Sequence, residues 1–157
     1  MSSDGYLFNI PLLAQQQYRM FHDIYILLDS SDRQILSAFN LTTSQYTTLL
    51  LLDVSNGQRL GYLSDRLLVD KSTVTRIIDQ LEREGLVQRV ADPTDRRAQR
   101  VLLTSAGLER RTKAYAAHTE SLERRLNSLT PVEQTLLRDL LVKLRAGLRA
   151  YLGIPDV

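Results

Sequence analysis

The side chains best suited to chemistry in this sequence are hydroxyls and cations gathered in one short segment, residues 70–104. The guanidinium group of arginine can donate two hydrogen bonds at once to phosphate oxygens or to the edge of guanine, and lysine pairs with phosphate as a point charge. Small hydroxyls at the start of a helix let that end, with its free N–H groups, approach a phosphate closely. These residue types support non-covalent recognition of double-stranded DNA. The candidate DNA contacts are Lys71, Ser72, Thr73, Thr75, Arg76, Arg96 and Arg97.

The charges are unevenly distributed along the chain, although the formal net charge is only +2. Residues 1–58 carry two basic and five acidic side chains, a balance of −3. Residues 59–111 carry eleven basic and eight acidic side chains (+3), and residues 112–157 carry seven and five (+2). Solvated helix faces would give a similar distribution, so the basic bias supports DNA binding only because it coincides with the candidate contacts.

The sequence lacks the residue patterns of an enzyme or a metal site. Its two histidines, His22 and His118, stand 96 positions apart without carboxylates at ligand spacing, and cysteine is absent. Neither a Gly-rich phosphate loop nor a G-x-S-x-G motif accompanies the serines. We therefore expect no catalytic residue, no metal and no cofactor.

Length and composition indicate one globular domain with its own hydrophobic core. The chain has 157 residues, of which 43% are hydrophobic, as is ordinary for a soluble protein. A membrane span needs an apolar run of about 18 residues, and the sequence contains none. The N-terminal residues lack the basic region and cleavage site of a secretory signal. These features predict a cytoplasmic protein that does not bind membranes.

A helix from Asp70 to about Gly85 would position the first group of candidate contacts. Aspartate is a common helix cap, and glycine commonly ends a helix. Asp79 follows Arg76 by three positions and precedes Arg83 by four, so we expect its carboxylate to hold these arginines. An ordinary amphipathic helix with a solvated outer face would show the same pattern. The apolar face consists of Val74, Ile77, Ile78 and Leu81.

Two β-type runs after this helix, residues 86–91 and 100–104, predict a hairpin. The sequence DPTD at 92–95 is a turn with proline at its second position, which brings Arg96 and Arg97 to the tip. Two adjacent like charges do not stabilise an exposed tip, whereas the negative potential of a narrow minor groove favours them. We therefore expect the hairpin to be a DNA-binding wing.

The remaining sequence predicts helices, several with clear capping signals. Thr42 with Gln45, and Thr130-Pro131 with Glu133, have the residue types of a capping box. The fold class is therefore mainly α with a small β-hairpin wing, a winged helix-turn-helix flanked by long dimerisation helices. The further predicted elements are helices near 9–38, from 42 to about Asn56-Gly57, near 62–68, from Thr104 to about Ser128 and from Thr130 onward, with a short strand at Arg59-Leu60.

Three stretches of the sequence, LTTSQYTTLLLL, VDKSTVTRIIDQLEREGLVQR and DPTDRRAQRVLLTSAG, resemble the MarR family of winged helix-turn-helix transcriptional regulators. The resemblance spans nearly the whole chain, and the DPTDRR wing followed by LTSAG is its most specific part. It implies a single domain over residues 1–157, with a DNA-binding region at 41–104 and a helical dimerisation region at 1–40 and 105–157. One departure is Leu68, which stands where the family usually has glycine in the turn before the recognition helix.

The resemblance also implies a mode of action. A homodimer would bind a palindromic operator, usually as a repressor, with Ser72, Thr73, Thr75 and Arg76 at recognition positions and Arg97 in the minor groove beside Arg96. A homodimer also agrees with the many apolar residues of the last helix, which exceed the needs of one small core. Relatives often release DNA on binding a small aromatic or phenolic effector. Such an effector could contact Tyr18, Arg19, His22, Tyr25 and Tyr46, which could equally be core or surface residues with satisfied polar tips.

Two other interpretations remain open from the sequence. The winged helix could be a protein-interaction module, or it could bind DNA without sequence preference as an architectural protein. Charge at the wing tip favours a DNA partner over a neutral protein. Binding that weakens steeply with salt separates a DNA partner from an apolar protein interface, and discrimination between sequences separates a regulator from an architectural protein.

Overall fold

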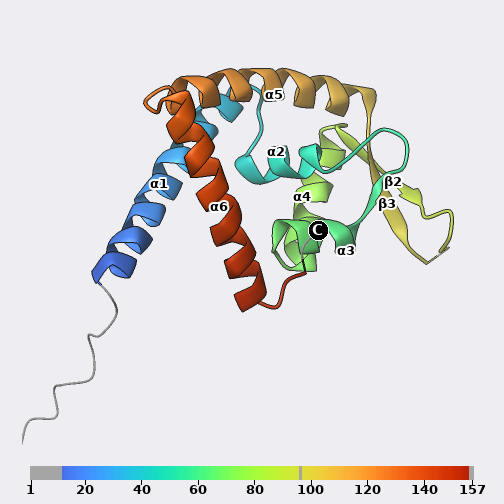
Figure 1. The fold of residues 1–157 in the computed structure, drawn as a ribbon. Helices are drawn as coiled ribbons and strands as arrows, with labels where there is room; N and C mark the ends of the chain where they lie inside the picture. Colours follow the sequence, from blue (N-terminus) through green and yellow to red (C-terminus); the bar gives the residue numbers. More distant parts are fainter. Residues whose placement is uncertain (1–11, 96, 156–157) are drawn as a thin grey trace, which may run out of the picture. The chain divides into compact units, whose positions relative to one another are not determined.

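The computed structural model describes residues 12–95 and 97–155. It is largely helical with one small sheet, which confirms the predicted fold class (Figure 1). Along the described residues the elements are α1 (Leu12–Ser37), α2 (Thr43–Leu50), β1 (Gln58–Arg59), α3 (Leu60–Leu67), α4 (Lys71–Arg83), β2 (Val87–Ala91), β3 (Gln99–Leu103), α5 (Ser105–Leu126) and α6 (Pro131–Tyr151).

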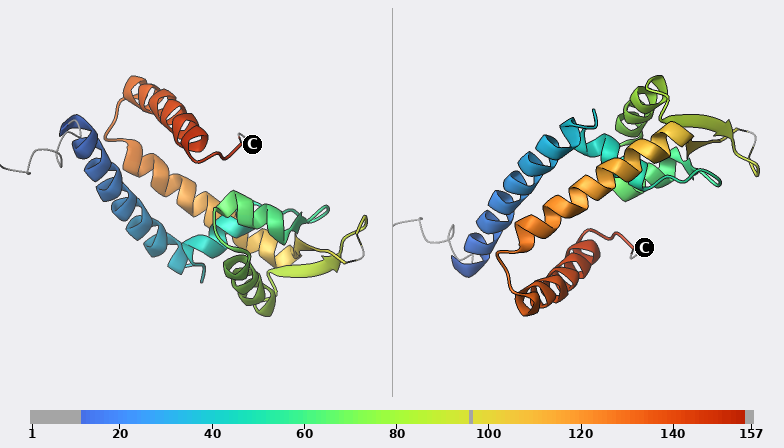
Figure 2. Two further views of the ribbon diagram at one scale, coloured as in Figure 1. Left: turned by 90° about the horizontal axis from the view of Figure 1, so that it is seen from below. Right: turned by 90° about the horizontal axis from the view of Figure 1, so that it is seen from above.

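The chain divides into two compact units, residues 1–118 and residues 119–157. The first unit contains α1 to α4, the sheet and most of α5, and the second contains the end of α5 and all of α6. Within the first unit the β2–β3 hairpin projects from the group of helices α2, α3 and α4 (Figures 1 and 2). No helix in the described part of the chain is both long and apolar enough to cross a membrane.

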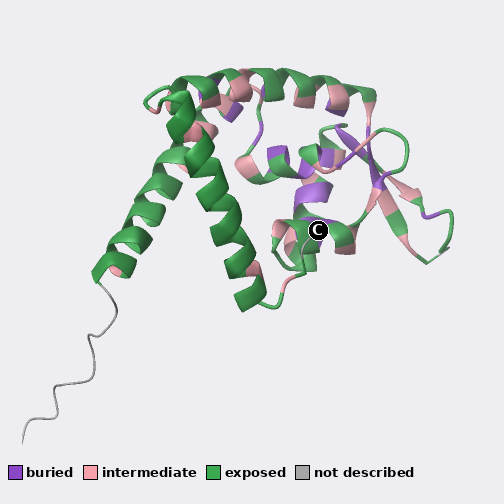
Figure 3. Cartoon of the chain, in the orientation of Figure 1, coloured by how far each residue is buried: buried purple, intermediate pink, exposed green. Residues whose placement is uncertain are grey.

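The hydrophobic core lies where α2, α3 and α4 pack beside the sheet (Figure 3). The predicted apolar face of α4 is buried there in full. The sheet contributes Val87, Val101 and Leu103, while Leu36 and Ala114 come from α1 and α5. This core fixes α4 in place and leaves its opposite face open to solvent.

The sheet has the order β1-β3-β2, with both pairings antiparallel. The hairpin register runs from Val87 opposite Leu103 to Ala91 opposite Gln99. The predicted hairpin is therefore confirmed, and the strand expected at Arg59-Leu60 forms at Gln58–Arg59. Because β1 pairs with β3, the residues just before α3 lie beside β3 near the loop end of the hairpin.

Helix α2 ends at Leu50, so the predicted end near Asn56-Gly57 is wrong. The carboxylate of Asp53 accepts hydrogen bonds from the backbone N–H groups of Asn56, Ser55 and Gly57 at 2.7, 2.9 and 3.2 Å, and these bonds lower its pKa. These backbone groups are held in a loop and are not available to a helix. At Gly57, where φ is +63°, an added Cβ would lie 2.9 Å from the carbonyl oxygen of Val101.

In the turn between α3 and α4, a leucine adopts the left-handed backbone conformation that glycine usually occupies. Leu68 has φ 53° and ψ 42°, and its side chain is largely exposed. Behind it, the Ser64 hydroxyl donates to the carbonyl oxygen of Val69 at 2.7 Å, and the N–H of Val69 donates to the carbonyl oxygen of Ser64 at 3.2 Å. The surrounding bonds therefore hold a leucine in a conformation that costs it roughly 1–2 kcal/mol.

The predicted capping signals at the starts of α2, α5 and α6 are confirmed. Thr42 and Gln45 form a capping box at α2, and Thr130 and Glu133 form another at α6. The Thr104 hydroxyl accepts a hydrogen bond from the N–H of Gly107 at 3.0 Å at the start of α5. Helix α3 begins at Leu60, two residues earlier than expected, and α5 ends at Leu126 instead of about Ser128.

Candidate nucleic-acid interface

Asp70 organises the N-terminus of α4, a helix that carries five of the seven candidate contacts. Its carboxylate accepts hydrogen bonds from the Ser72 hydroxyl at 2.5 Å and from the N–H and hydroxyl of Thr73 at 2.7 and 3.1 Å. These hydrogen bonds, led by that of Ser72, lower the pKa of Asp70 to about 2. The hydroxyl of Thr75 donates to the carbonyl oxygen of Lys71 at 2.8 Å. The three hydroxyls are therefore already used as donors, which leaves each able to accept a hydrogen bond, and the two threonines can also offer a methyl group.

Three of the candidate cations are exposed and available to an anion. Within the described residues, the side chains of Lys71, Arg76 and Arg97 have no hydrogen-bond or ion-pair partner. Lys71 begins α4, Arg76 lies on its exposed face, and Arg97 lies at the wing tip. Arg96, the fourth cation expected there, lies outside the described residues.

Asp79, on the exposed face of α4, has a different partner from the two arginines predicted. Asp79 pairs with the guanidinium of Arg89 on β2 at 2.5 Å, so the prediction that its carboxylate holds Arg76 and Arg83 is wrong. Arg83 donates only to the backbone carbonyl of Asp79, at 3.3 Å. Arg89 also pairs with Glu82, to which its backbone N–H donates at 3.0 Å. The side chain of Arg89 is 19% exposed, because the hairpin brings β2 against α4.

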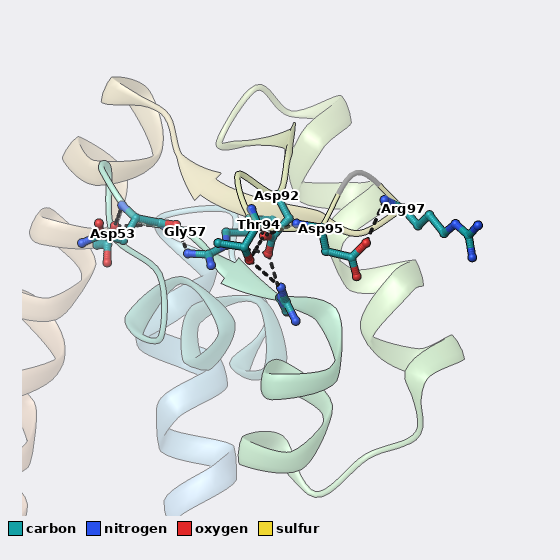
Figure 4. A network of polar contacts seen from close by, with 9 residues as sticks. Asp53, Gly57, Asp92, Thr94, Asp95 and Arg97 are labelled. Atoms are coloured by element: carbon teal, nitrogen blue, oxygen red, sulfur yellow. Dashed lines mark hydrogen bonds and ion pairs between the residues drawn. The ribbon is translucent and has the colours of Figure 1, made fainter.

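A buried aspartate holds the loop of the wing in place. The Asp92 side chain is 0% exposed, and one of its oxygens accepts hydrogen bonds from the Nε atoms of Arg59 and Arg100 at 2.7 and 2.8 Å. Its other oxygen accepts bonds from the N–H and hydroxyl of Thr94 and from the N–H of Asp95 (Figure 4). The two guanidinium groups, with the Thr94 hydroxyl, hold the pKa of Asp92 far below its ordinary value.

The wing tip follows directly from this arrangement. The Asp95 carboxylate accepts a hydrogen bond from the backbone N–H of Arg97 at 3.0 Å. The guanidinium of Arg97 extends away from the network into solvent (Figure 4). The sequence indicates residues 92–95 only as a turn. It does not reveal the roles of Asp92, Arg59 and Arg100, because Arg59 lies 33 positions before Asp92 and reaches it only in the folded chain.

The residues predicted for an effector occupy two environments. Tyr18, Arg19, His22 and Tyr25 are exposed on α1. Tyr46 is only 4% exposed within α2.

Tyr46 belongs to a small polar cluster from three helices. Its hydroxyl lies 3.4 Å from Nδ1 of His118, and Nε2 of His118 lies 3.1 Å from the carboxylate of Asp32. Burial raises the pKa of the Tyr46 hydroxyl, with smaller contributions from Tyr115 and Asp32. His118 therefore lies within hydrogen-bonding distance of partners from α1 and α2 inside the first unit.

Comparison with known proteins agrees with this geometry. The family model described as MarR family matches residues 41–98, which include α2 to α4 and β2. YkoM, an HTH-type transcriptional regulator of Bacillus subtilis (strain 168), is 32% identical over 130 residues, covering 83% of this chain and 84% of that protein.

Solved structures give the same result. AbsC, a MarR family transcriptional regulator from Streptomyces coelicolor, superposes with a TM-score of 0.79 at 28% identity, covering 92% of this chain and 98% of AbsC. A cysteine-to-serine mutant of MarR from E. coli, complexed with operator DNA, gives a TM-score of 0.73 at 28% identity over 80% of this chain and 91% of that one. These proteins are transcriptional regulators, in agreement with the expectation of a protein that is not an enzyme. The matching winged helix-turn-helix and the similarity over most of its length establish that this chain belongs to the MarR family of transcriptional regulators.

Proposed function

We propose that this protein is a cytoplasmic repressor that binds a palindromic operator as a homodimer and releases it on binding a small aromatic or phenolic ligand. The observation that carries the proposal is the division of cations in residues 59–100. Arg59, Arg89 and Arg100 are held by carboxylates, while Lys71, Arg76 and Arg97 project without partners in the described structure. The paired cations hold the wing and α4 in place, and the unpaired cations remain available for DNA.

Two of the three unpaired cations, Arg76 and Arg97, suit the two grooves of a duplex. An α-helix fits the major groove, where Arg76 on α4 could form a bidentate contact with a guanine edge. The β2–β3 hairpin is narrow enough for the minor groove, whose negative potential attracts the guanidinium of Arg97. The complex of the MarR mutant with operator DNA supports DNA as the partner of a related fold.

The exposed apolar residues of the helices support a homodimer. Helix α6 has no buried residue, although Leu136, Leu140 and Leu148 are among its many large apolar side chains. Helix α1 likewise exposes Leu13 and Phe21. A second copy would cover such surfaces, and a two-fold dimer would contact two half-sites about 34 Å apart.

The proposed effector would contact the exposed polar and aromatic side chains of α1. Tyr18, Tyr25 and His22 offer ring surfaces with polar tips, and Arg19 offers a partner for a carboxylate. Tyr46 could take part only through a rearrangement, because its side chain is in the core. Such a ligand would release DNA only if it binds the DNA-free conformation of the dimer more tightly than the DNA-bound conformation.

The first test is a titration of the purified protein against the DNA upstream of its own gene and against a scrambled control, at two salt concentrations. We expect tight binding to a palindrome, one dimer per site, with affinity that falls steeply with salt. Equal affinity for both DNAs would instead indicate an architectural protein. Failure to bind either DNA, with protein shown to be free of bound ligand, would favour a protein-interaction module.

A further inference from the structure

We propose that a groove between α3 and the wing holds the DNA strand that separates the major groove from the adjacent minor groove, with Tyr62 and Gln99 donating to its phosphates. This inference rests on the proposed DNA binding and names a further part of the same surface. It also gives a role to two side chains that sequence analysis did not select.

The groove has a volume of about 870 Å³ and lies within the first unit of the chain. Its walls come from the start of α3, the first residue of α4, strand β2 and the wing. The lining residues are Arg59, Leu60, Gly61, Tyr62, Asp65, Lys71, Arg89, Val90, Ala91, Arg97, Ala98 and Gln99.

The electrostatics of the groove favour an anion. Four of the lining residues are cations and one, Asp65, is an acid. Arg59 and Arg89 are already paired with carboxylates. Lys71 and Arg97 therefore supply the unpaired positive charge, which outweighs the single charge of Asp65 by one. A polyanion that passes from α4 toward the wing would meet both cations.

The geometry of DNA suggests which polyanion this is. In a B-form duplex, one sugar–phosphate backbone separates a major groove from the neighbouring minor groove. If α4 enters the major groove and the wing tip enters the minor groove, that backbone must pass between the N-terminus of α4 and the wing. The groove lies between these two elements, with Lys71 on one and Arg97 on the other.

Tyr62 and Gln99 are the neutral donors along this path. Tyr62 is 39% exposed, and neither side chain forms a hydrogen bond within the described residues. Helix α3 presents the tyrosine, and the first position of β3 presents the glutamine. A phenol O–H and an amide N–H both donate to phosphate oxygens, and such contacts position a protein on DNA without selecting sequence.

Tyr62→Phe removes only the hydroxyl and leaves the ring in place. We expect binding about tenfold weaker on every sequence, which corresponds to about 1.4 kcal/mol. The dependence of affinity on salt should not change, because no charge is lost. Lys71→Ala should lower the slope of log Kd against log salt by about one. Tyr115→Phe makes the same chemical change on an exposed tyrosine of α5 and should bind DNA as the parent protein does.

Operators with single methylphosphonates, which remove the charge of one phosphate at a time, give the decisive measurement. In the parent protein, replacing the phosphates between the two contacted grooves should weaken binding. In Tyr62→Phe, and separately in Gln99→Ala, the same replacement should have a much smaller effect, since the donor is already missing. Circular dichroism of each variant would verify its fold.

The assignment of the groove would be overturned if the side-chain replacement and the phosphate replacement weakened binding additively at every phosphate, in variants that remain folded. The proposed function would survive that result if the parent protein still bound its operator with specificity and salt dependence. Loss of specific binding by the parent protein would reject both proposals.

Discussion

At the scale of single residues, the arginines of the winged region differ in what already holds them. Arg89 pairs with both Asp79 and Glu82 near the end of α4, so an acid can lie on the exposed face of the helix that we propose enters the major groove. Arg59 and Arg100 meet at Asp92. A guanidinium paired with a carboxylate has fewer free N–H donors for a phosphate. We therefore expect the DNA contacts to come from the unpaired cations.

Arg76 is expected to determine sequence preference. Replacing it with alanine should cost about 1–3 kcal/mol of binding free energy and relax discrimination at one base pair in each half-site. Titrations against operators changed one base pair at a time would measure this effect. An equal loss on all of these operators would identify Arg76 as a phosphate contact instead.

Arg97 is expected to contribute through the shape of the minor groove. Arg97→Ala should weaken binding mainly on operators with A·T-rich flanks, because narrow minor grooves attract arginine most strongly. Operators that differ only in their flanks provide the comparison. Unchanged affinity on both kinds of flank would refute the role assigned to the wing.

Asp70 should make the stability of the fold depend on pH in the acid range. The hydrogen bonds from Ser72 and Thr73 lower its pKa to about 2 in the folded state, while an unfolded aspartate has a pKa of about 3.9. The stabilisation is therefore fully present above pH about 4 and is lost as the pH falls through about 2.

Asp70→Asn keeps a capping side chain but cannot titrate. The difference in unfolding free energy between the parent protein and this variant should shrink between pH about 4 and about 2. Urea unfolding at several pH values would measure it. Asp23→Asn, which removes a carboxylate without a partner in the described structure, is the matched control. A difference that stays constant over this range would contradict the assigned role of Asp70.

At the scale of elements, two connections determine how the wing and α4 are presented. The wing is held to the start of α3 by Arg59 and to the loop before β1 by Arg100, which donates to the carbonyl oxygen of Asn56 at 3.1 Å. Helix α4 is held to β2 by Arg89. Together these ion pairs and hydrogen bonds join the hairpin, the start of α3 and α4 into one surface.

The turn between α3 and α4 contains a backbone conformation that leucine adopts at a cost. Leu68→Gly should relieve this strain, partly offset by the greater freedom of glycine in the unfolded chain. We expect a free energy of unfolding that is unchanged or higher by up to about 1 kcal/mol. Denaturant unfolding of both proteins tests this. Leu67→Gly, within the preceding helix, should destabilise the fold, and a Leu68→Gly variant that is equally destabilised would contradict the strain.

At the scale of the whole molecule, the apolar surfaces of the helices require an explanation that one copy of the chain does not provide. Leu140→Glu places a charge on the leucine-rich face of α6, whereas Thr135→Glu adds the same charge away from that face. If a second copy covers the leucines, only Leu140→Glu should shift the protein toward monomer and weaken operator binding strongly.

Sedimentation velocity over a range of concentrations, followed by DNA titration, would measure both effects. A parent protein that is monomeric at micromolar concentration would refute the homodimer. Equal behaviour of the two variants would show instead that this face of α6 is not the interface.

The sequence by itself determined the features that depend on near neighbours and on pattern. The caps at Thr42, Asp70 and Thr130 join residues two or three positions apart, and the apolar face of α4 follows from helical spacing. The hairpin follows from a turn sequence between two β-type runs. Such interactions depend only on the local backbone conformation, so they can be predicted from the sequence.

Only the tertiary structure decided which distant groups meet. Asp79 is nearer in sequence to Arg76 and Arg83, yet it pairs with Arg89 because β2 packs against α4. Asp92 gathers Arg59 from 33 positions away, and His118 reaches Asp32 across 86 positions. An ion pair forms with the partner that the folded chain brings within about 4 Å, and sequence distance does not specify that partner.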